Sequence, residues 1–267
     1  MIMRFLLLAL LALFAHPVAA PAQAPDAALR DKFAARVFED GQGGRLLYRL
    51  LQPPAYDSTR RYPLVLFLHG AGERGSNNVA QLKNGVLEFA KDDLQARYPA
   101  FVVVPQVPQN NKWSDTDWRA LQAALPAQPS GSLRMTMELL KALRAEFSID
   151  GERIYVTGVS MGGYGTWDAI CRYPGFFAAA APVCGGGDEK QAELIKDLPI
   201  WCFHGDKDSA VPVVRSRNMI EALRQAGGAP KYTELPGVGH NAWDYAYGDP
   251  ALFDWLFAQK QGAPAAP

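Results

Sequence analysis

The sequence predicts an α/β fold in three layers, with a mostly parallel central sheet between two layers of helices. Short apolar segments alternate along the chain with segments whose apolar residues recur at helical spacing, as is typical of strands buried on both faces. The 267 residues are 49% hydrophobic and 20% charged, which is the composition of a globular protein. No repeat, charge block or long linker interrupts residues 30–260, so we expect one domain at residues 36–260.

The strands are predicted from short apolar runs that end at Gly, Pro or polar turn residues. Several of these runs are rich in Val and Ile, which favour strands because branched side chains pack well on a pleated surface. The runs lie at residues 46–51, 64–68, 101–104, 154–157, 177–183, 200–203 and 231–235.

The helices are predicted from apolar residues that recur every three or four positions. This spacing is found at residues 133–147 and 213–226. A further helix is expected from about Gly163, and another near the C-terminus, so that helices can cover both faces of the sheet.

The two ends of the chain are expected to lie outside the domain. Residues 1–24 read as a signal peptide, with an early Arg4, an apolar run, and small residues before a cut at 20–24. His16 and Pro17 stop the apolar run short of the ~20 residues that span a bilayer, so we expect export to the periplasm or medium, with no membrane attachment after cleavage. Residues 25–35 and 261–267 are interpreted as tails, the latter flexible.

Charge and cysteine content exclude several classes of partner. Lys+Arg and Asp+Glu both number 27, so no excess of positive charge indicates a nucleic-acid partner. Cys171, Cys184 and Cys202 have none of the spacings typical of zinc or redox sites, so no metal and no cofactor is expected. An exported chain could oxidise one cysteine pair, but the odd count leaves the pairing open. The oligomeric state is also left open.

The clearest motif is G-x-S-x-G at residues 158–162, between a predicted strand and a predicted helix. A turn of this kind brings the backbone so close to its neighbours that Gly158 and Gly162 are needed where a side chain would collide. It would hold the Ser160 hydroxyl above the sheet. A phosphate-binding loop is the alternative, but no Lys follows the glycines and G-x-G-x-x-G is absent.

A reactive Ser160 would need a base, because a hydroxyl is a weak nucleophile near neutral pH. His16 lies in the expected signal peptide. His69 and His204 each stand in a His-Gly pair at a strand end, where an imidazole more often holds a loop. His240 lies in a Gly-rich loop after the strand at 231–235, and catalytic side chains are often carried on such loops. His240 is therefore the candidate base, largely by elimination.

The base would in turn need an orienting acid. Asp206 and Asp208 both follow the strand at 200–203 and fall between Ser160 and His240 in the chain order Ser, Asp, His. Position in the chain alone does not choose between the two.

These motifs together resemble the α/β-hydrolase family: G-x-S-x-G, then H-G-x-x-D-x-x-V-P at residues 204–212, then a Gly-His pair near the C-terminus. The resemblance implies a three-layer α/β-hydrolase fold and assigns the acid to Asp208, leaving Asp206 to structure its loop. It also implies that the backbone N–H groups of Met161 and Ala71 form an oxyanion hole. We expect Glu73 and Arg74 to form a local ion pair that holds the loop of Ala71.

A narrower resemblance covers residues 35–258 and includes H-G-A-G-E-R-G at 69–75. It points to exported serine carboxylesterases akin to feruloyl esterases and polyhydroxybutyrate depolymerases, whose relatives are sometimes labelled peptidases or phospholipases. It implies a small-molecule or polymer-linked ester as substrate. Residues 185–199 leave little material for a large lid. In the long polar stretch 105–132, Trp113 is a candidate wall for an aromatic or sugar moiety, as is Trp243 beyond His240; plain packing is the alternative for both.

Three alternatives to a serine esterase stay open. The same constellation cleaves amides in peptidases of the prolyl-oligopeptidase type, although those usually carry a large propeller domain that this length does not accommodate. A non-catalytic binding protein on a hydrolase scaffold would not need all three candidate positions filled. Acyl transfer to an alcohol other than water is also compatible. A thiol hydrolase is disfavoured because position 160 is Ser.

Overall fold

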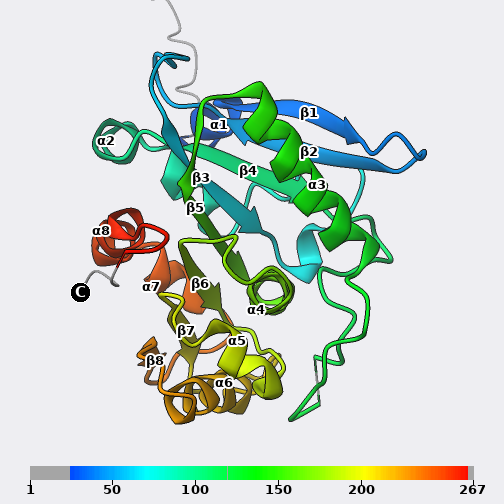
Figure 1. The fold of residues 1–267 in the computed structure, drawn as a ribbon, viewed down its shortest axis with the longest axis vertical. Helices are drawn as coiled ribbons and strands as arrows, with labels where there is room; N and C mark the ends of the chain where they lie inside the picture. Colours follow the sequence, from blue (N-terminus) through cyan, green and yellow to red (C-terminus); the bar gives the residue numbers. More distant parts are fainter. Residues whose placement is uncertain (1–24, 119, 264–267) are drawn as a thin grey trace, which may run out of the picture.

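The computed structural model describes residues 25–118 and 120–263, which form one eight-stranded sheet covered by helices on both faces (Figure 1). The strand order is β1-β2-β4-β3-β5-β6-β7-β8. β1 pairs antiparallel with β2, β2 pairs antiparallel with β4, and the other neighbours pair parallel. The predicted three-layer architecture with a mostly parallel sheet is confirmed.

All seven predicted strands are present, and one further strand, β1, precedes them in the chain. Their bounds are β1 Phe33–Glu39, β2 Arg45–Leu51, β3 Tyr62–Leu68, β4 Phe101–Gln106, β5 Ile149–Val159, β6 Ala179–Val183, β7 Trp201–Gly205 and β8 Lys231–Leu235.

Several short helices accompany the predicted ones. The α-helices are α1 Pro25–Asp31, α2 Asp92–Arg97, α3 Gly131–Glu146, α4 Met161–Arg172, α5 Ala192–Ile195, α6 Val214–Gln225, α7 Ala242–Ala246 and α8 Pro250–Ala258. Three 3-10 helices are η1 Ala71–Glu73, η2 Val86–Ala90 and η3 Glu189–Gln191.

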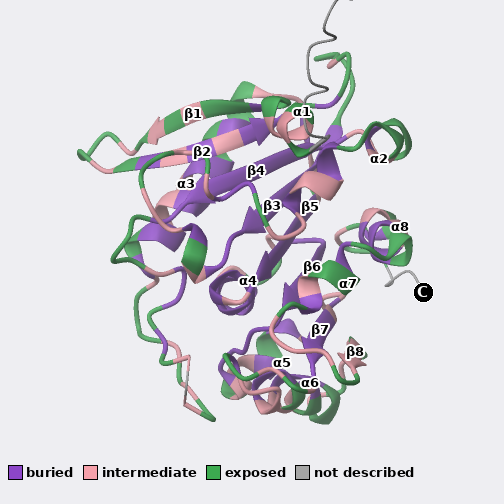
Figure 2. Cartoon of the chain, turned by 180° about the vertical axis from the view of Figure 1, so that it is seen from behind, coloured by how far each residue is buried: buried purple, intermediate pink, exposed green. Residues whose placement is uncertain are grey.

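Two hydrophobic clusters lie one on each face of the sheet. Helices α3, α4, α5 and α6 supply one cluster, which includes the buried Trp167 and Met219. Helices α7 and α8 and η2 supply the other, which includes Phe89 and Trp255. The central strands β3 and β4 are buried along their whole length, whereas β1 is partly exposed at the sheet edge (Figure 2). Burial on both faces explains why the central strands are continuously apolar.

The expected N-terminal tail at residues 25–35 is wrong, since these residues form α1 and the start of β1. Phe33 is buried and pairs with Leu51 in the antiparallel register of β1 and β2. The Lys32 ammonium donates to the carbonyl of Ala90 at 2.8 Å. The expected signal peptide at residues 1–24 lies outside the described residues.

The C-terminal boundary also lies further out than predicted. Gln261, expected to begin a flexible tail, donates its backbone N–H to the carbonyl of Glu152 at 2.9 Å and its side-chain amide to the carbonyl of Gly175. The packed part of the chain therefore extends beyond residue 260. Within residues 25–118 and 120–263 no helix has the length and apolar character needed to cross a membrane.

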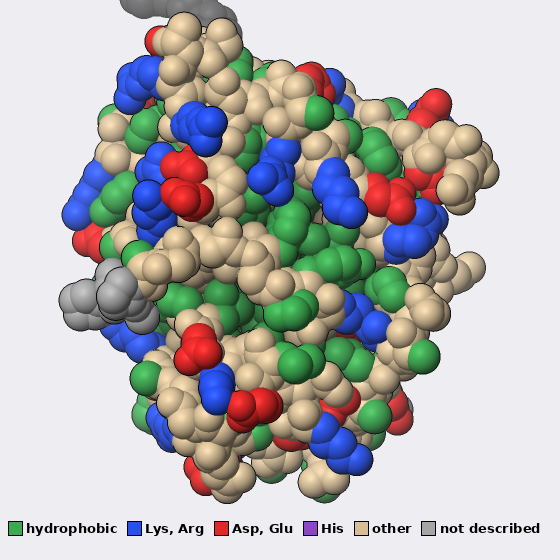
Figure 3. All heavy atoms as spheres, viewed as in Figure 1, with side chains coloured by type: hydrophobic (Ala, Val, Ile, Leu, Met, Phe, Trp, Pro, Cys, Tyr) green, Lys and Arg blue, Asp and Glu red, His purple; other side chains and the backbone are tan. Residues whose placement is uncertain are grey.

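Charged side chains of both signs are interspersed on the face drawn in Figure 3. This distribution agrees with the equal numbers of basic and acidic residues in the sequence.

Candidate active site

Ser160 stands at a sharp turn between β5 and α4, at the carboxyl edge of the sheet. Its backbone has φ 56° and ψ −115°, a conformation that is strained for a residue with a side chain. A Cβ on Gly162 would lie 1.8 Å from the carbonyl oxygen of Leu68, and one on Gly158 would lie 2.5 Å from the carbonyl oxygen of Gly162. The two glycines of the motif are therefore required by backbone contacts, as the sequence predicted.

His240 and Asp208 extend from Ser160 as a continuous chain of hydrogen bonds. The Ser160 Oγ lies 2.9 Å from His240 Nε2, and His240 Nδ1 lies 2.7 Å from Asp208 Oδ2. The three residues follow β5, β7 and β8, whose carboxyl ends meet at the same edge of the sheet. The structure thus brings together the three side chains that the sequence singled out.

Backbone bonds fix the loop of Asp208 against the loop of His240. The N–H of Lys207 donates to the carbonyl of Val238 at 2.9 Å. Asp206 Oδ1 accepts the N–H of Gly237 at 2.7 Å, so this carboxylate holds the loop that carries His240. This contact agrees with the structural role expected for Asp206.

The Asp208 side chain is fully buried, whereas that of His240 is 26% exposed. Burial alone would favour the neutral acid. Hydrogen bonds from His204, His240 and the N–H of Val211 outweigh this effect and lower the pKa of Asp208 well below its usual range. Asp208 is therefore an ionised carboxylate that can stabilise a proton on His240.

Met161 and Ala71, the two residues expected to form an oxyanion hole, are near Ser160: Met161 follows it in the chain and Ala71 lines the cleft beside it. Met161 is the first residue of α4, so its N–H is one of those that a helix leaves without an intrahelical acceptor. Ala71 begins η1 and lines the same cleft as Ser160 and His240. A Cβ on the preceding Gly70 would lie 3.7 Å from Ser160 Cβ, which shows how closely this loop approaches the serine.

Two indoles, Trp118 and Trp243, line the cleft. The Trp243 ring stands edge-on to the His240 imidazole, with centroids 5.3 Å apart. Trp118 comes from the long loop after β4, where its carbonyl accepts the Tyr164 hydroxyl at 2.9 Å. The sequence had singled out Trp243 but not Trp118.

The assignment of Trp113 to the cleft wall is wrong. Its side chain is fully buried, and its indole N–H donates to the carbonyl of His69 at 2.9 Å. The small residue Gly165 on α4 makes room for it, because a Cβ there would lie 2.5 Å from Trp113 Cβ. Trp113 thus packs the loop onto the sheet, which was the alternative reading.

The expected ion pair between Glu73 and Arg74 is also wrong. Across the part of the chain that the structure describes, no ion pair joins them; Arg74 Nε instead donates to the carbonyl of Ala71 at 2.9 Å. The Glu73 carboxyl turns toward the cleft, where it lines the wall with Asn84. Burial raises the pKa of Glu73.

His69 and His204 hold loops, as expected from their places at strand ends. His69 Nε2 accepts the N–H of Val107 at 3.0 Å, and burial lowers the pKa of His69 to about 4. His204 Nε2 lies 3.1 Å from the carbonyl oxygen of Val211 in the loop of Asp208, and its Nδ1 lies 2.7 Å from Ser216 Oγ on α6.

The cysteines and the stretch after β6 add no further catalytic groups. Cys171, Cys184 and Cys202 are free, buried thiols. Cys184, His204 and Asp208 have donor atoms within 4.8 Å of one another and are the described residues that could surround a metal ion. Asp208 and His204 already bond each other there. Residues 185–199 contain only the short η3 and α5 in place of a large lid.

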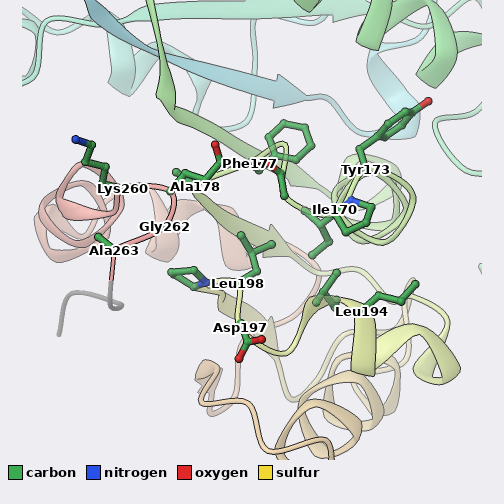
Figure 4. Close-up of a pocket in the computed structure, with 15 residues that line it drawn as sticks. Ile170, Tyr173, Phe177, Ala178, Leu194, Asp197, Leu198, Lys260, Gly262 and Ala263 are labelled. Carbon is green, nitrogen blue, oxygen red and sulfur yellow. Dashed lines mark hydrogen bonds between the residues drawn. The ribbon is translucent and has the colours of Figure 1, made fainter.

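A second hollow lies at the amino ends of β6 and β7 (Figure 4). Ile170, Phe177, Leu194 and Leu198 line it together with Lys260 near the C-terminus. Ser160, Asp208 and His240 follow the opposite ends of the strands, so this hollow is separate from the candidate active site.

The sheet order, the strained serine turn and the Ser-His-Asp chain define an α/β hydrolase. The family model Esterase, described as "Putative esterase", matches residues 43–255. The chain belongs to this esterase family, and the resemblance to α/β-hydrolase esterases is confirmed.

Three relatives illustrate the similarity. A solved structure titled as a thermostable esterase has a TM-score of 0.81 and 41% identity, over 87% of this chain and 64% of that one. Poly(3-hydroxyalkanoate) depolymerase C of Paucimonas lemoignei is 29% identical over 240 residues, which are 77% of this chain and 56% of that protein. An "Uncharacterized secreted protein" of Arthroderma benhamiae is 28% identical over 236 residues, 74% of this chain and 24% of that protein. The chain spans less than two thirds of each of the three.

Proposed function

We propose that this protein is a serine hydrolase of carboxylic esters, with Ser160 as nucleophile, His240 as general base and Asp208 as the orienting acid. The observation that carries the proposal is the unbroken chain from Ser160 Oγ through His240 to the buried Asp208 carboxylate. Membership of the esterase family supports the choice of esters.

In the proposed mechanism His240 Nε2 takes the hydroxyl proton while Ser160 Oγ attacks the ester carbonyl carbon. The negative charge that forms on the carbonyl oxygen is stabilised by the N–H groups of Met161 and Ala71, each worth about 3–4 kcal/mol in such sites. His240 then gives its proton to the leaving alcohol. Water, activated by the same imidazole, releases the acid from the acyl-serine.

Asp208 has two tasks in this scheme. Its bond to Nδ1 keeps the His240 ring in the tautomer whose Nε2 accepts the serine proton. Because its pKa is lowered, Asp208 stays ionised, and its negative charge stabilises the imidazolium that forms during attack.

For substrate we propose a small or polymer-linked ester. The cleft is open beside Ser160, and Trp118 and Trp243 offer flat apolar surfaces against which an acyl or alcohol group can pack. The similarity to a polyester depolymerase supports a polymer-linked ester. We also propose export, with residues 1–24 removed, which the similarity to a secreted protein supports.

The test is Ser160→Ala, assayed on p-nitrophenyl acetate, butyrate and palmitate, on methyl ferulate and on a peptide amide. Ester cleavage should be lost with the fold intact, and a serine-directed phosphonate should label wild-type Ser160 alone. Ser209→Ala is the control, since it removes an exposed hydroxyl from the loop of Asp208. Near wild-type turnover in Ser160→Ala would refute the mechanism, and amide cleavage that exceeds ester cleavage would favour a peptidase.

A further inference from the structure

A second histidine, His204, contacts the candidate acid Asp208 in addition to His240. His204, in β7, is fully buried, and its Nε2 lies 3.2 Å from Asp208 Oδ2 and 3.1 Å from the carbonyl oxygen of Val211. Asp208 Oδ2 is the same oxygen that contacts His240 Nδ1 at 2.7 Å. One carboxylate oxygen therefore bridges two imidazoles.

The partners of His204 decide where its proton lies. Both oxygens near Nε2 can only accept, because one is a backbone carbonyl and the other belongs to an ionised carboxylate. Nε2 must therefore carry a hydrogen. On the other side, Nδ1 meets the Ser216 hydroxyl at 2.7 Å, and this hydroxyl lies 2.9 Å from the carbonyl of Gly185. Ser216 thus anchors the ring at the end away from Asp208.

With His204 counted, the carboxylate of Asp208 has no free lone pair. Oδ1 accepts the N–H groups of Ala210 and Val211 at 2.9 and 2.8 Å, and Oδ2 lies 2.7 Å from His240 Nδ1 and 3.2 Å from His204 Nε2, whose N–H it shares with the Val211 carbonyl. These four donors fill the roughly four acceptor sites of a carboxylate. Without His204, the oxygen that holds His240 would have one partner in a buried site that excludes water.

We propose that His204 is a positioning residue, whose Nε2–H holds Asp208 Oδ2 at the place and in the charge state that His240 requires. This inference rests on the proposed function of Asp208. His204 does not touch Ser160 or the cleft, so it acts on catalysis only through the carboxylate.

Two substitutions separate the two ends of the ring. In His204→Gln the amide nitrogen reaches about as far as Nε2, so the donor to Asp208 is kept and the contact with Ser216 is lost. In His204→Asn the shorter amide keeps the contact with Ser216 and loses the donor to Asp208. Ser216→Ala is the matched control, because it removes the anchor on Nδ1, together with the contacts of this hydroxyl to Gly185 and Cys202, and leaves the Nε2 side of the ring unchanged.

We expect His204→Asn to lower kcat on p-nitrophenyl acetate by about tenfold, the size that a hydrogen bond to a charged group supports, with KM almost unchanged. His204→Gln and Ser216→Ala should stay within about threefold of wild type. The downfield proton resonance of the His240 Nδ1–H should be kept in the Gln variant and shifted or lost in the Asn variant. Thermal unfolding, measured for all three, identifies any loss that is due to misfolding.

Equal losses in the Gln and Asn variants would overturn the proposal, as would wild-type kcat in a folded Asn variant. Should the Asn variant not fold, the nitrogen spectrum of the wild-type imidazoles decides: Nε2 of His204 must be protonated, and an unprotonated Nε2 would overturn the proposal. Ser160→Ala separates this inference from the proposed function. If Ser160→Ala is inactive and folded His204→Asn is fully active, only the role of His204 fails.

Discussion

Asp206 and Asp208 lie two residues apart on one turn, but they bond to different parts of the His240 loop. Asp208 Oδ2 contacts the His240 imidazole at 2.7 Å, whereas Asp206 Oδ1 accepts the N–H of Gly237 at 2.7 Å. One carboxylate therefore orients the ring, and the other fixes the backbone that carries it.

This division predicts different effects of removing each charge. Asp208→Asn leaves His240 without an anionic partner and favours the wrong tautomer, so kcat should fall by up to about 10⁴-fold. Asp206→Asn keeps an acceptor for Gly237, so kcat should stay within about threefold and the free energy of unfolding should fall by roughly 1 kcal/mol. The measurement is kcat at pH 7–8 together with thermal unfolding. A folded but inactive Asp206→Asn would contradict the assignment.

The two tryptophans of the loop after β4 should respond in opposite ways to truncation. Trp118→Ala removes a wall of the cleft, so KM for aromatic esters should rise several-fold while the melting temperature changes little. Trp113→Ala empties a fully buried site and should cost about 3–5 kcal/mol of unfolding free energy. Steady-state kinetics on methyl ferulate and urea unfolding of both variants test this pair. A destabilised Trp118→Ala with unchanged KM would show that its ring only packs the loop.

His69 should make the stability of the protein sensitive to mild acid. Because burial lowers the pKa of His69 from 6.5 to about 4, the folded protein keeps this ring neutral while the unfolded chain binds a proton below pH 6.5. The stability contributed by the neutral ring is therefore present above pH 6.5 and is lost as the pH falls toward 4. The slope should be about 1.4 kcal/mol per pH unit.

His69→Gln is the comparison, because its amide oxygen can still accept the N–H of Val107 and does not titrate. Urea unfolding at several values between pH 7 and 4.5 should give a flatter profile for the variant than for wild type. If the unfolding free energies of wild type and variant fell in parallel with pH, His69 would not contribute to the loss of stability in acid.

Two glycines near the serine should differ in their tolerance of a methyl group. Gly162→Ala would place Cβ 1.8 Å from the carbonyl oxygen of Leu68, so we expect loss of the folded protein or a cost above about 4 kcal/mol. Gly72→Ala meets no heavy atom within 4 Å and should change the unfolding free energy by less than about 0.5 kcal/mol. Soluble yield and circular dichroism show whether each variant folds. A Gly162→Ala variant that folds like wild type would contradict this prediction.

Local patterns predicted most of the sheet and the Ser160 turn. Buried strands appear in the sequence as short apolar runs, and the turn appears as a serine between two glycines, so a few neighbouring residues are enough to identify each. β1 escaped prediction since it lies at a partly exposed edge, where its pairing with β2 rather than its own composition defines it. Trp113 and Trp118 could not be told apart for a similar reason. Their orientations depend on bonds to His69 and Tyr164, each more than 40 residues away in the chain.

The contacts that hold Ser160 run from backbone to backbone, whereas side chains of Trp118 and Ala210 on two loops and of Trp243 on α7 line the cleft. Substitutions at these three positions can therefore remodel the cleft without displacing the nucleophile. A combinatorial library confined to them would sample new ester preferences around an unchanged Ser160 turn.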